Sequence, residues 1–168
     1  MEVIFFRHGI AMEQEEWRGD DDDRPLTKAG AGSTKLAAQG LCALKVQPDI
    51  FLSSPLLRAR QTAEIVQEAL GAKSKIEVVD DLCPNAPPER LFTRLAHFSD
   101  DSVVLCVGHE PHLSTTISAA ISGKTAAAIA MKKAAACAVL FADQPQAGAG
   151  KLIWLIPPKA LRLLGGRA

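Results

Sequence analysis

Short apolar runs, separated by turn-forming residues, recur along the chain and predict the strands of a central sheet. The run Val103-Val104-Leu105-Cys106-Val107 is continuously apolar, which is typical of a strand covered on both faces. Similar runs open the chain and return near its middle and its end. We predict strands over residues 2–6, 49–53, 76–79, 102–107, 135–142 and 151–156.

Between these runs, apolar positions follow a helical spacing. The clearest case is a stripe of apolar residues three or four apart, which indicates one buried face of a helix. The stripe consists of Leu56, Ala59, Ala63, Val66 and Leu70. Ser54 would cap this helix and Pro55 would begin it. We predict helices over residues 27–44, 55–70, 88–98 and 111–122, and a short one over 158–164.

The alternation of strands and helices predicts an α/β fold, a layered single domain in which helices flank a central, mostly parallel sheet. Residues 1–164 form this domain, and residues 165–168 form a C-terminal tail. The stretch 126–138 is ambiguous, because its alanines favour a helix whereas residues 137–141 and the loop that follows favour a hairpin. We predict the hairpin. The first helix contains three glycines, so packing must stabilise it.

Composition and charge exclude several classes of function. The 168 residues include 19 Lys or Arg and 19 Asp or Glu, so the net charge is zero and nonspecific nucleic-acid binding is not expected. There is no apolar run of about 18 residues and no basic segment with an apolar core at the N-terminus. We therefore expect a cytoplasmic protein without membrane association. The cysteines lack Cys-x-x-Cys spacing and are expected to be reduced, while Lys132 and Lys133 are expected to be solvated.

Basic residues follow three of the predicted strands. Arg7-His8-Gly9 comes directly after the first, Arg58 lies at the start of the helix after the second, and His109 follows the fourth. Because the carboxyl ends of parallel strands share one edge of a sheet, these side chains are expected to converge. Helix N-termini at the same edge add amides and partial positive charge. Four cation-capable groups without a carboxylate need an anion among them, so the pattern predicts a phosphate site.

The order and spacing of these motifs resemble the histidine phosphatase superfamily of phosphoglycerate-mutase-like enzymes. The matching features are Arg-His-Gly at 7–9, Ser-Pro-x-x-Arg-Ala-x-x-Thr-Ala at 54–63 and Gly-His at 108–109. The resemblance covers nearly the whole chain. The short length and the segment Arg24-Pro25-Leu26-Thr27 resemble, more narrowly, the SixA-type phosphohistidine phosphatase branch.

The resemblance implies a role for each matching residue. His8 would be the nucleophile that carries the phosphoryl group, while Arg7, Arg58 and a protonated His109 would hold and neutralise its oxygens. Elementary chemistry agrees, since a neutral imidazole is nucleophilic near pH 7 and cations stabilise the equatorial oxygens. Gly9 would allow a close backbone approach where a Cβ would intrude. No metal or cofactor is required for this chemistry.

Two patterns resemble metal sites but are better explained otherwise. The acidic run 20–23 lacks the alternating ligands of a calcium loop and is expected to be a solvated loop. His112 follows His109 at a spacing that could serve zinc, but no third ligand lies nearby in sequence. A rim or substrate contact is the favoured role for His112.

A clear general acid is missing from the pattern. Mutase-like relatives place a carboxylic acid after the third strand, where Asp81 is the nearest candidate and Glu89 follows; a solvated loop acid is an equal alternative for Asp81. Glu13 or the acidic run 20–23 could also approach the site. A phosphorylated imidazole can leave after protonation on its far nitrogen, whereas an alkoxide needs a proton from an acid. A site poor in acids therefore favours phosphohistidine as the substrate.

The leading hypothesis is a metal-independent phosphohydrolase that removes phosphate from phosphohistidine in a protein, for example a histidine phosphotransfer domain. The short segment 80–88 would leave the pocket open to a side chain of another protein. Two alternatives stay open: a phosphatase for a small phosphorylated metabolite, phosphoester or nucleotide, and a non-catalytic phospho-ligand binding module. An aligned nucleophile beside two arginines argues against the binding module.

Overall fold

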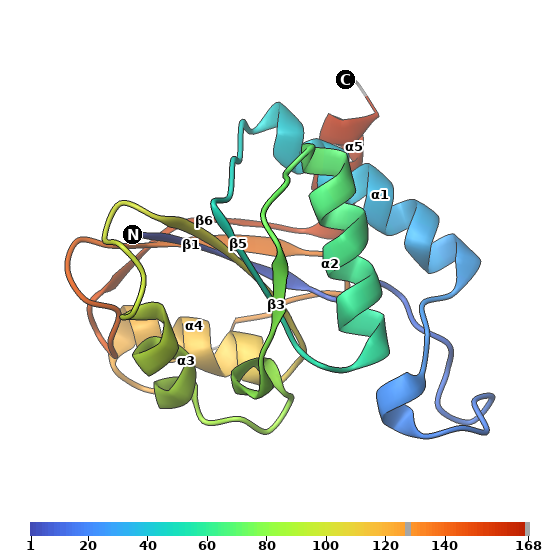
Figure 1. Cartoon of the computed structure of the whole chain (residues 1–168), viewed down its shortest axis with the longest axis horizontal. Coiled ribbons are helices and arrows are strands. Elements are labelled where there is room, and N and C mark those ends of the chain that lie inside the picture. Colours follow the sequence, from blue (N-terminus) through green and yellow to red (C-terminus); the bar gives the residue numbers. More distant parts are fainter. Residues whose placement is uncertain (127–128, 167–168) are drawn as a thin grey trace.

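A single sheet runs through the chain with helices around it (Figure 1). It has six strands in the order β3-β2-β4-β1-β5-β6. The structure is a computed structural model that describes residues 1–126 and 129–166. The strands are β1 (Glu2–Arg7), β2 (Ile50–Ser53), β3 (Ile76–Val78), β4 (Val103–Gly108), β5 (Ala136–Phe141) and β6 (Gly150–Ile156).

The sheet is mostly parallel, as predicted. β4 pairs in parallel with both β1 and β2, and β2 pairs in parallel with β3. β5 runs antiparallel to β1 and forms a hairpin with β6. The hairpin predicted for stretch 126–138 is confirmed only from Ala136 onward. Residues 129–135 form a loop and turn, and residues 127–128 lie outside the described residues.

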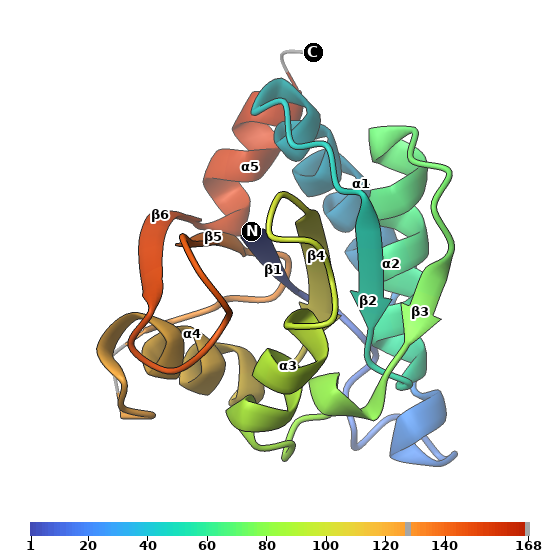
Figure 2. The ribbon, with the colours of Figure 1, turned by 60° about the vertical axis from the view of Figure 1, so that its left-hand side comes forward.

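Helices cover both faces of the sheet. α1, α2 and α5 lie on one face, and α3 and α4 lie on the other (Figure 2). The helices are α1 (Lys28–Ala43), α2 (Leu57–Leu70), α3 (Pro88–Leu95), α4 (His112–Ser122) and α5 (Pro158–Gly165), with short 3₁₀ helices η1 (Asp21–Asp23) and η2 (Asp80–Leu82). No helix in this described part of the chain combines the length and the apolarity that crossing a membrane requires.

Two of the predicted helix ends are wrong. The helix predicted to begin at Pro55 begins at Leu57, because Leu56 is still extended. The Ser54 hydroxyl makes its shorter hydrogen bond, at 2.8 Å, to His109 and only a long one, at 3.4 Å, to the Leu56 N–H. The helix predicted to reach residue 98 ends at Leu95, where the chain tightens into a turn closed by His97 N–H donating to the Arg94 carbonyl.

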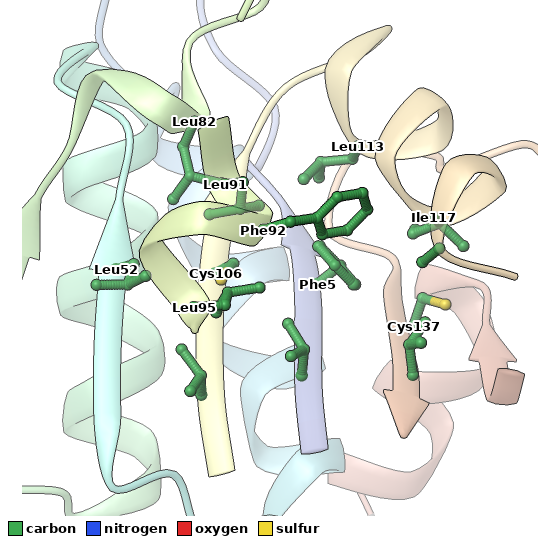
Figure 3. Packing of buried hydrophobic residues seen from close by; sticks show 14 of the residues in the cluster. Phe5, Leu52, Leu82, Leu91, Phe92, Leu95, Cys106, Leu113, Ile117 and Cys137 are labelled. Atoms are coloured by element: carbon green, nitrogen blue, oxygen red, sulfur yellow. The ribbon is translucent and has the colours of Figure 1, made fainter. Parts of the chain in front are cut away.

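Apolar side chains fill both interfaces between the sheet and its helices. On the α3–α4 side, Leu91 of α3 and Leu113 of α4 face the strands (Figure 3). The strand residues in this layer include Phe5, Leu52, Cys106 and Cys137. The central strands β1 and β4 are thus buried on both faces, which explains their continuous apolar sequences.

Glycines in α1 allow it to pack closely against α5. A Cβ at Gly40 would lie 2.2 Å from the Leu161 carbonyl oxygen, and a Cβ at Gly165 would lie 2.1 Å from the Leu36 carbonyl oxygen. This close contact is what the expected stabilisation of the glycine-containing helix by packing requires; the stabilisation itself stays a prediction. Of the expected tail 165–168, Gly165 ends α5 in a buried position, and residues 167–168 lie outside the described residues.

The same substitution at two positions of α1 is expected to change stability in opposite directions. Gly40→Ala should lower the free energy of unfolding by about 1–3 kcal/mol or more, because α5 must shift to admit the methyl group. Gly32 is exposed, and a Cβ at this position would have no neighbour within 4 Å. Gly32→Ala should therefore raise the free energy of unfolding by about 0.5–1 kcal/mol. Urea unfolding of both variants measures the two changes. Equal effects would contradict this account of the α1–α5 contact.

Candidate functional site

The predicted site residues meet at one edge of the sheet. In the register of β1 and β4, Arg7 is paired with Gly108, so His8 and His109 follow side by side. Their ring centroids are 4.9 Å apart, with the planes tilted by 51°. Arg58 lies in the first turn of α2, and its charge, like that of Arg7, acts on both imidazoles. The structure thus brings together the four residues that the sequence pattern singled out.

Hydrogen bonds fix the position and the tautomer of His8. Its backbone N–H donates to the Gly108 carbonyl at 3.0 Å, and its own carbonyl accepts from the Ala134 N–H at 3.2 Å. The side-chain Nδ1 lies 2.7 Å from the Gly9 carbonyl oxygen. Because a carbonyl can only accept, Nδ1 carries the hydrogen and Nε2 keeps its lone pair. His8 therefore presents a nucleophilic nitrogen.

The surroundings also keep His8 uncharged. The residue is 6% exposed, and burial lowers the pKa of its imidazole to about 3. The hydrogen bond to Gly9 opposes this shift, whereas the positive charges of Arg58, Arg7 and Lys133 add to it. At neutral pH the Nε2 lone pair is available for attack rather than occupied by a proton.

Both arginines are anchored by part of their guanidinium groups. Arg7 Nη1 donates to the Met131 carbonyl at 2.7 Å. Arg58 Nη1 donates to the Asp21 carbonyl at 2.8 Å, and its Nη2 lies 3.0 Å from Asp21 Oδ2. In each arginine the Nε–H is buried without a hydrogen-bond partner among the described residues. These hydrogen bonds hold the two guanidinium groups in place and leave their other N–H donors available for an anion.

A carboxylate lies among the cations, contrary to expectation. Asp21 of η1 pairs with Arg58 and, at 2.8 Å, with Arg24 Nε. Burial alone would raise the pKa of Asp21, but hydrogen bonds and charge from the two arginines outweigh it and the pKa is lowered. The acidic run 20–23 is thus a solvated loop only in part, because one of its members supports Arg58.

His109 is neutral in the free protein, which corrects the expectation of a protonated imidazole. It is 2% exposed, and burial lowers the pKa of its imidazole to about 2, a shift to which the positive charges of Arg58 and Arg7 add. Its Nε2 lies 2.8 Å from Ser54 Oγ, while its Nδ1 is buried without a partner among the described residues. Any contribution of His109 to anion binding must therefore begin with an uncharged ring.

Gly9 is required by packing against α1. A Cβ at this position would lie 2.2 Å from Thr34 Oγ1. The Gly9 N–H donates to Thr62 Oγ1 at 3.0 Å, and the Thr62 hydroxyl donates to the Arg58 carbonyl at 2.7 Å. The close approach expected here is thus made to a helix, and the same contacts connect the nucleophile loop to the first turn of α2.

Asp81, the candidate general acid, is engaged by two arginines of α3. Arg90 Nε lies 2.9 Å from Oδ1, and Arg94 Nε donates to Oδ2. The carboxylate lines a cavity of about 320 Å³ together with Arg90, Arg94, Thr93 and His97. Glu89 lines a neighbouring cavity on α3. Both oxygens of Asp81 are therefore occupied on the α3 side of η2.

Two residues near the site were not singled out for it by sequence reasoning. Ser54 bonds to His109, although its position before a proline suggested a helix cap. Lys133 is half-buried and contributes charge to His8, although a pair of lysines suggests a solvated turn. Neither contact can be recognised from neighbouring residues in the sequence, because each joins residues that are far apart along the chain.

His112 is buried next to the site. It is 2% exposed, its Nε2 lies 3.2 Å from Thr116 Oγ1 within α4, and it is close enough to His109 to affect the pKa of that imidazole. A role for His112 as a substrate contact stays a prediction. Across residues 1–126 and 129–166, no group of three or more His, Cys, Asp or Glu side chains is arranged to hold a metal ion.

Three buried histidines predict a loss of stability in mild acid. Burial lowers the pKa of His8, His109 and His112 to about 3, 2 and 4, whereas an unfolded histidine has a pKa of about 6.5. Between these pKa values the unfolded chain binds more protons than the folded protein. The free energy of unfolding is therefore highest above about pH 6.5 and decreases as the pH is lowered. Each histidine contributes up to about 1.4 kcal/mol per pH unit.

Urea unfolding at about pH 7.5 and about pH 5 measures this dependence. His112→Gln removes one of the three groups and should make the dependence shallower by about a third. Identical midpoints for the unmodified protein at the two pH values would contradict the inferred burial of neutral imidazoles.

Comparisons with known proteins identify relatives of this chain. A family model described as the histidine phosphatase superfamily (branch 1) matches residues 3–83. The chain is 30% identical to the phosphohistidine phosphatase SixA of Escherichia coli over 97% of this chain and 98% of that protein. It is 40% identical to an uncharacterized protein of Picosynechococcus, over 80% and 81% of the two chains. The solved structure of the protein histidine phosphatase SixA complexed with tungstate matches with a TM-score of 0.84 and 28% identity, covering 96% of this chain and 99% of that one.

Proposed function

The chain belongs to the histidine phosphatase superfamily, and on this basis we propose that it is a metal-independent phosphohydrolase that removes phosphate from phosphohistidine in a protein substrate. The observation that carries the proposal is the hydrogen bond of 2.7 Å from His8 Nδ1 to the Gly9 carbonyl. It leaves the unprotonated Nε2 of a neutral imidazole beside the guanidiniums of Arg7 and Arg58. This is the arrangement that attack on phosphorus requires.

The reaction proceeds in two displacements. In the first, the lone pair of His8 Nε2 forms a bond to phosphorus, and the P–N bond to the substrate imidazole breaks, with its electron pair going to that imidazole. In the second, a water oxygen bonds to phosphorus and the P–Nε2 bond breaks, so orthophosphate leaves, a proton passes to solvent and His8 returns to its neutral form. Arg7, Arg58 and His109 stabilise the oxygens in both steps.

The surroundings of Asp81 support phosphohistidine as the substrate. Both of its oxygens are bonded to arginines, so it is not free to protonate a leaving alkoxide. A phosphorylated imidazole that is protonated on its far nitrogen leaves as a neutral ring and needs no such acid. The E. coli relative, at 30% identity, is named a phosphohistidine phosphatase. We therefore propose a phosphorylated protein, such as a histidine phosphotransfer domain, as the partner.

A comparison of phosphodonors tests this proposal. The purified protein is incubated with a phosphohistidine-containing phosphotransfer domain and with a panel of phosphorylated sugars, nucleotides and serine esters, and orthophosphate release is followed with and without a chelator. We expect release from the phosphohistidine protein to be fastest and to be unchanged by the chelator. Fast hydrolysis of a small ester with the phosphohistidine protein left intact would instead identify a small-molecule phosphatase. Binding of a donor without release would identify a binding module.

A further inference from the structure

The two imidazoles of the site have partners of opposite kinds. His8 Nδ1 faces a carbonyl, which can only accept a hydrogen bond. His109 Nε2 faces the Ser54 hydroxyl at 2.8 Å, and a hydroxyl can either donate or accept. Which of these it does decides where the single hydrogen of the neutral His109 ring is located. It therefore decides what His109 Nδ1 offers to a bound phosphoryl group.

The backbone places Ser54 firmly beside His109. Ser53 of β2 is paired with Val107 of β4, and the Ser54 N–H donates to the Val107 carbonyl at 3.0 Å. Ser54 and His109 therefore lie just beyond these paired positions, at the ends of two adjacent strands. Ser54 is fully buried, so water does not compete for its hydroxyl.

The hydrogen bonds around Ser54 Oγ indicate that this hydroxyl donates to the imidazole. The Leu56 N–H approaches the oxygen at 3.4 Å as a donor, which leaves the hydroxyl hydrogen in need of an acceptor. Among the described residues His109 Nε2 is within hydrogen-bond distance, while the nearby Cys83 thiol offers sulfur, a much weaker acceptor than an imidazole nitrogen. If the imidazole donated instead, the Ser54 hydroxyl would lack a good acceptor in a buried position, which is costly.

We propose that Ser54 is a positioning residue that holds His109 in its Nδ1–H tautomer, so that an uncharged imidazole donates a hydrogen bond to the phosphoryl oxygens. The proposal deepens the proposed function and depends on it for its catalytic consequence. The buried Nδ1, which has no partner among the described residues, then carries the hydrogen that an oxyanion accepts. The opposite tautomer would direct a lone pair at the anion, which is repulsive. The carbonyl of Gly9 and the hydroxyl of Ser54 thus make one ring a nucleophile and the other a donor.

Nitrogen NMR of the histidine rings tests the tautomer without any substrate. In protein labelled with ¹⁵N-histidine, long-range proton–nitrogen correlations distinguish protonated from unprotonated ring nitrogens, and a His109→Gln variant assigns the signals. We expect His109 to be protonated at Nδ1 and unprotonated at Nε2 at neutral pH. Ser54→Ala should shift population to the Nε2–H form. Protonated Nε2 in the unmodified protein would overturn the proposal.

Kinetics on a phosphohistidine donor test the consequence. Ser54→Ala should lower kcat/KM by about 10- to 100-fold, less than the 10²- to 10³-fold effect of removing a donor outright, because the His109 ring stays in place and only its tautomer shifts. Ser54→Thr, which keeps a hydroxyl, should recover both the tautomer and much of the activity. Ser53→Ala is the matched control, since Ser53 is an equally buried serine whose hydroxyl donates to the Ser54 carbonyl at 3.0 Å. This variant should retain both the His109 tautomer and the activity of the unmodified protein.

The outcomes separate the two proposals. A Ser54→Ala protein as active as the unmodified one, with its tautomer altered, would overturn the positioning role while leaving the phosphatase proposal intact. An unmodified protein that releases phosphate from none of the donors would overturn the proposed function, while the NMR measurement would still establish the tautomer of His109.

Discussion

His8→Ala is expected to abolish the phosphorylated form of the enzyme and to lower kcat by about 10³-fold or more, because the substitution removes the proposed acceptor of the phosphoryl group. The measurement is incubation with a ³²P-labelled phosphodonor, followed by denaturing electrophoresis of an alkaline-quenched and an acid-treated sample. The unmodified protein should carry label that survives alkali and is lost in acid, as a phosphoramidate does. His8→Ala should carry none.

Two controls separate the nucleophile from a merely structural histidine. His112→Gln removes another buried imidazole that lies outside the four site residues, and it should label like the unmodified protein. Added imidazole should partly restore turnover to His8→Ala, since the free ring can take the phosphoryl group in the space that the side chain vacates. Persistent acid-labile label on His8→Ala would show that another residue is the nucleophile.

Arg58→Ala is expected to lower kcat/KM by about 10²- to 10³-fold, the usual effect of removing one donor that stabilises transition-state charge. Arg58 is 5% exposed, so its guanidinium acts where water does not screen it. Arg58→Lys should recover only part of the activity, because an ammonium group keeps the charge and lacks the planar fork. Steady-state kinetics with kcat and KM resolved, together with inhibition by orthophosphate, measure the change.

Asp21→Asn is the matched control for Arg58. It removes the carboxylate that pairs with Arg58 Nη2 and leaves the guanidinium in place. Since this carboxylate is partly exposed, the loss should be small, about tenfold at most. If Asp21→Asn and Arg58→Ala were equally impaired, the importance of Arg58 would lie in anchoring η1 and not in contacting the phosphoryl group.

The sheet and the convergence of the site could be predicted because both follow from rules that act along a chain. The apolar run of β4 indicates a strand covered on both faces, and residues that follow parallel strands meet at one edge. For this reason the amino-acid sequence alone is enough to place Arg7, His8 and His109 together. Arg58 follows from the same rule, applied to the first turn of the helix after β2.

The roles of Ser54 and Asp21 and the charge state of His109 could not be predicted, because they depend on tertiary contacts between residues far apart in the sequence. Ser54 satisfies the preferences of a helix cap, but a tertiary partner, His109, takes its hydroxyl. Asp21 looks like any acid of a solvated loop until the fold brings Arg58, 37 positions away, within 3.0 Å. The charge state of His109 differs from the expectation because burial beside two arginines determines its pKa, and the depth of that burial is a property of the packed fold that no stretch of sequence encodes by itself.

The position of β1 inside the sheet divides the site into a part held by paired strands and a part formed by loops at the edge. β1 is paired on both sides, with β4 and with β5, so His8 directly follows a strand in the interior of the sheet, which we expect to open less readily than the edge strands. η1 and the turn after β3 surround the same edge without belonging to that sheet. Exchange of the turn after β3 should change which substrates reach the site and leave Arg7, His8, Arg58 and His109 in place, whereas a grafted η1 must keep an acid at position 21 to anchor Arg58.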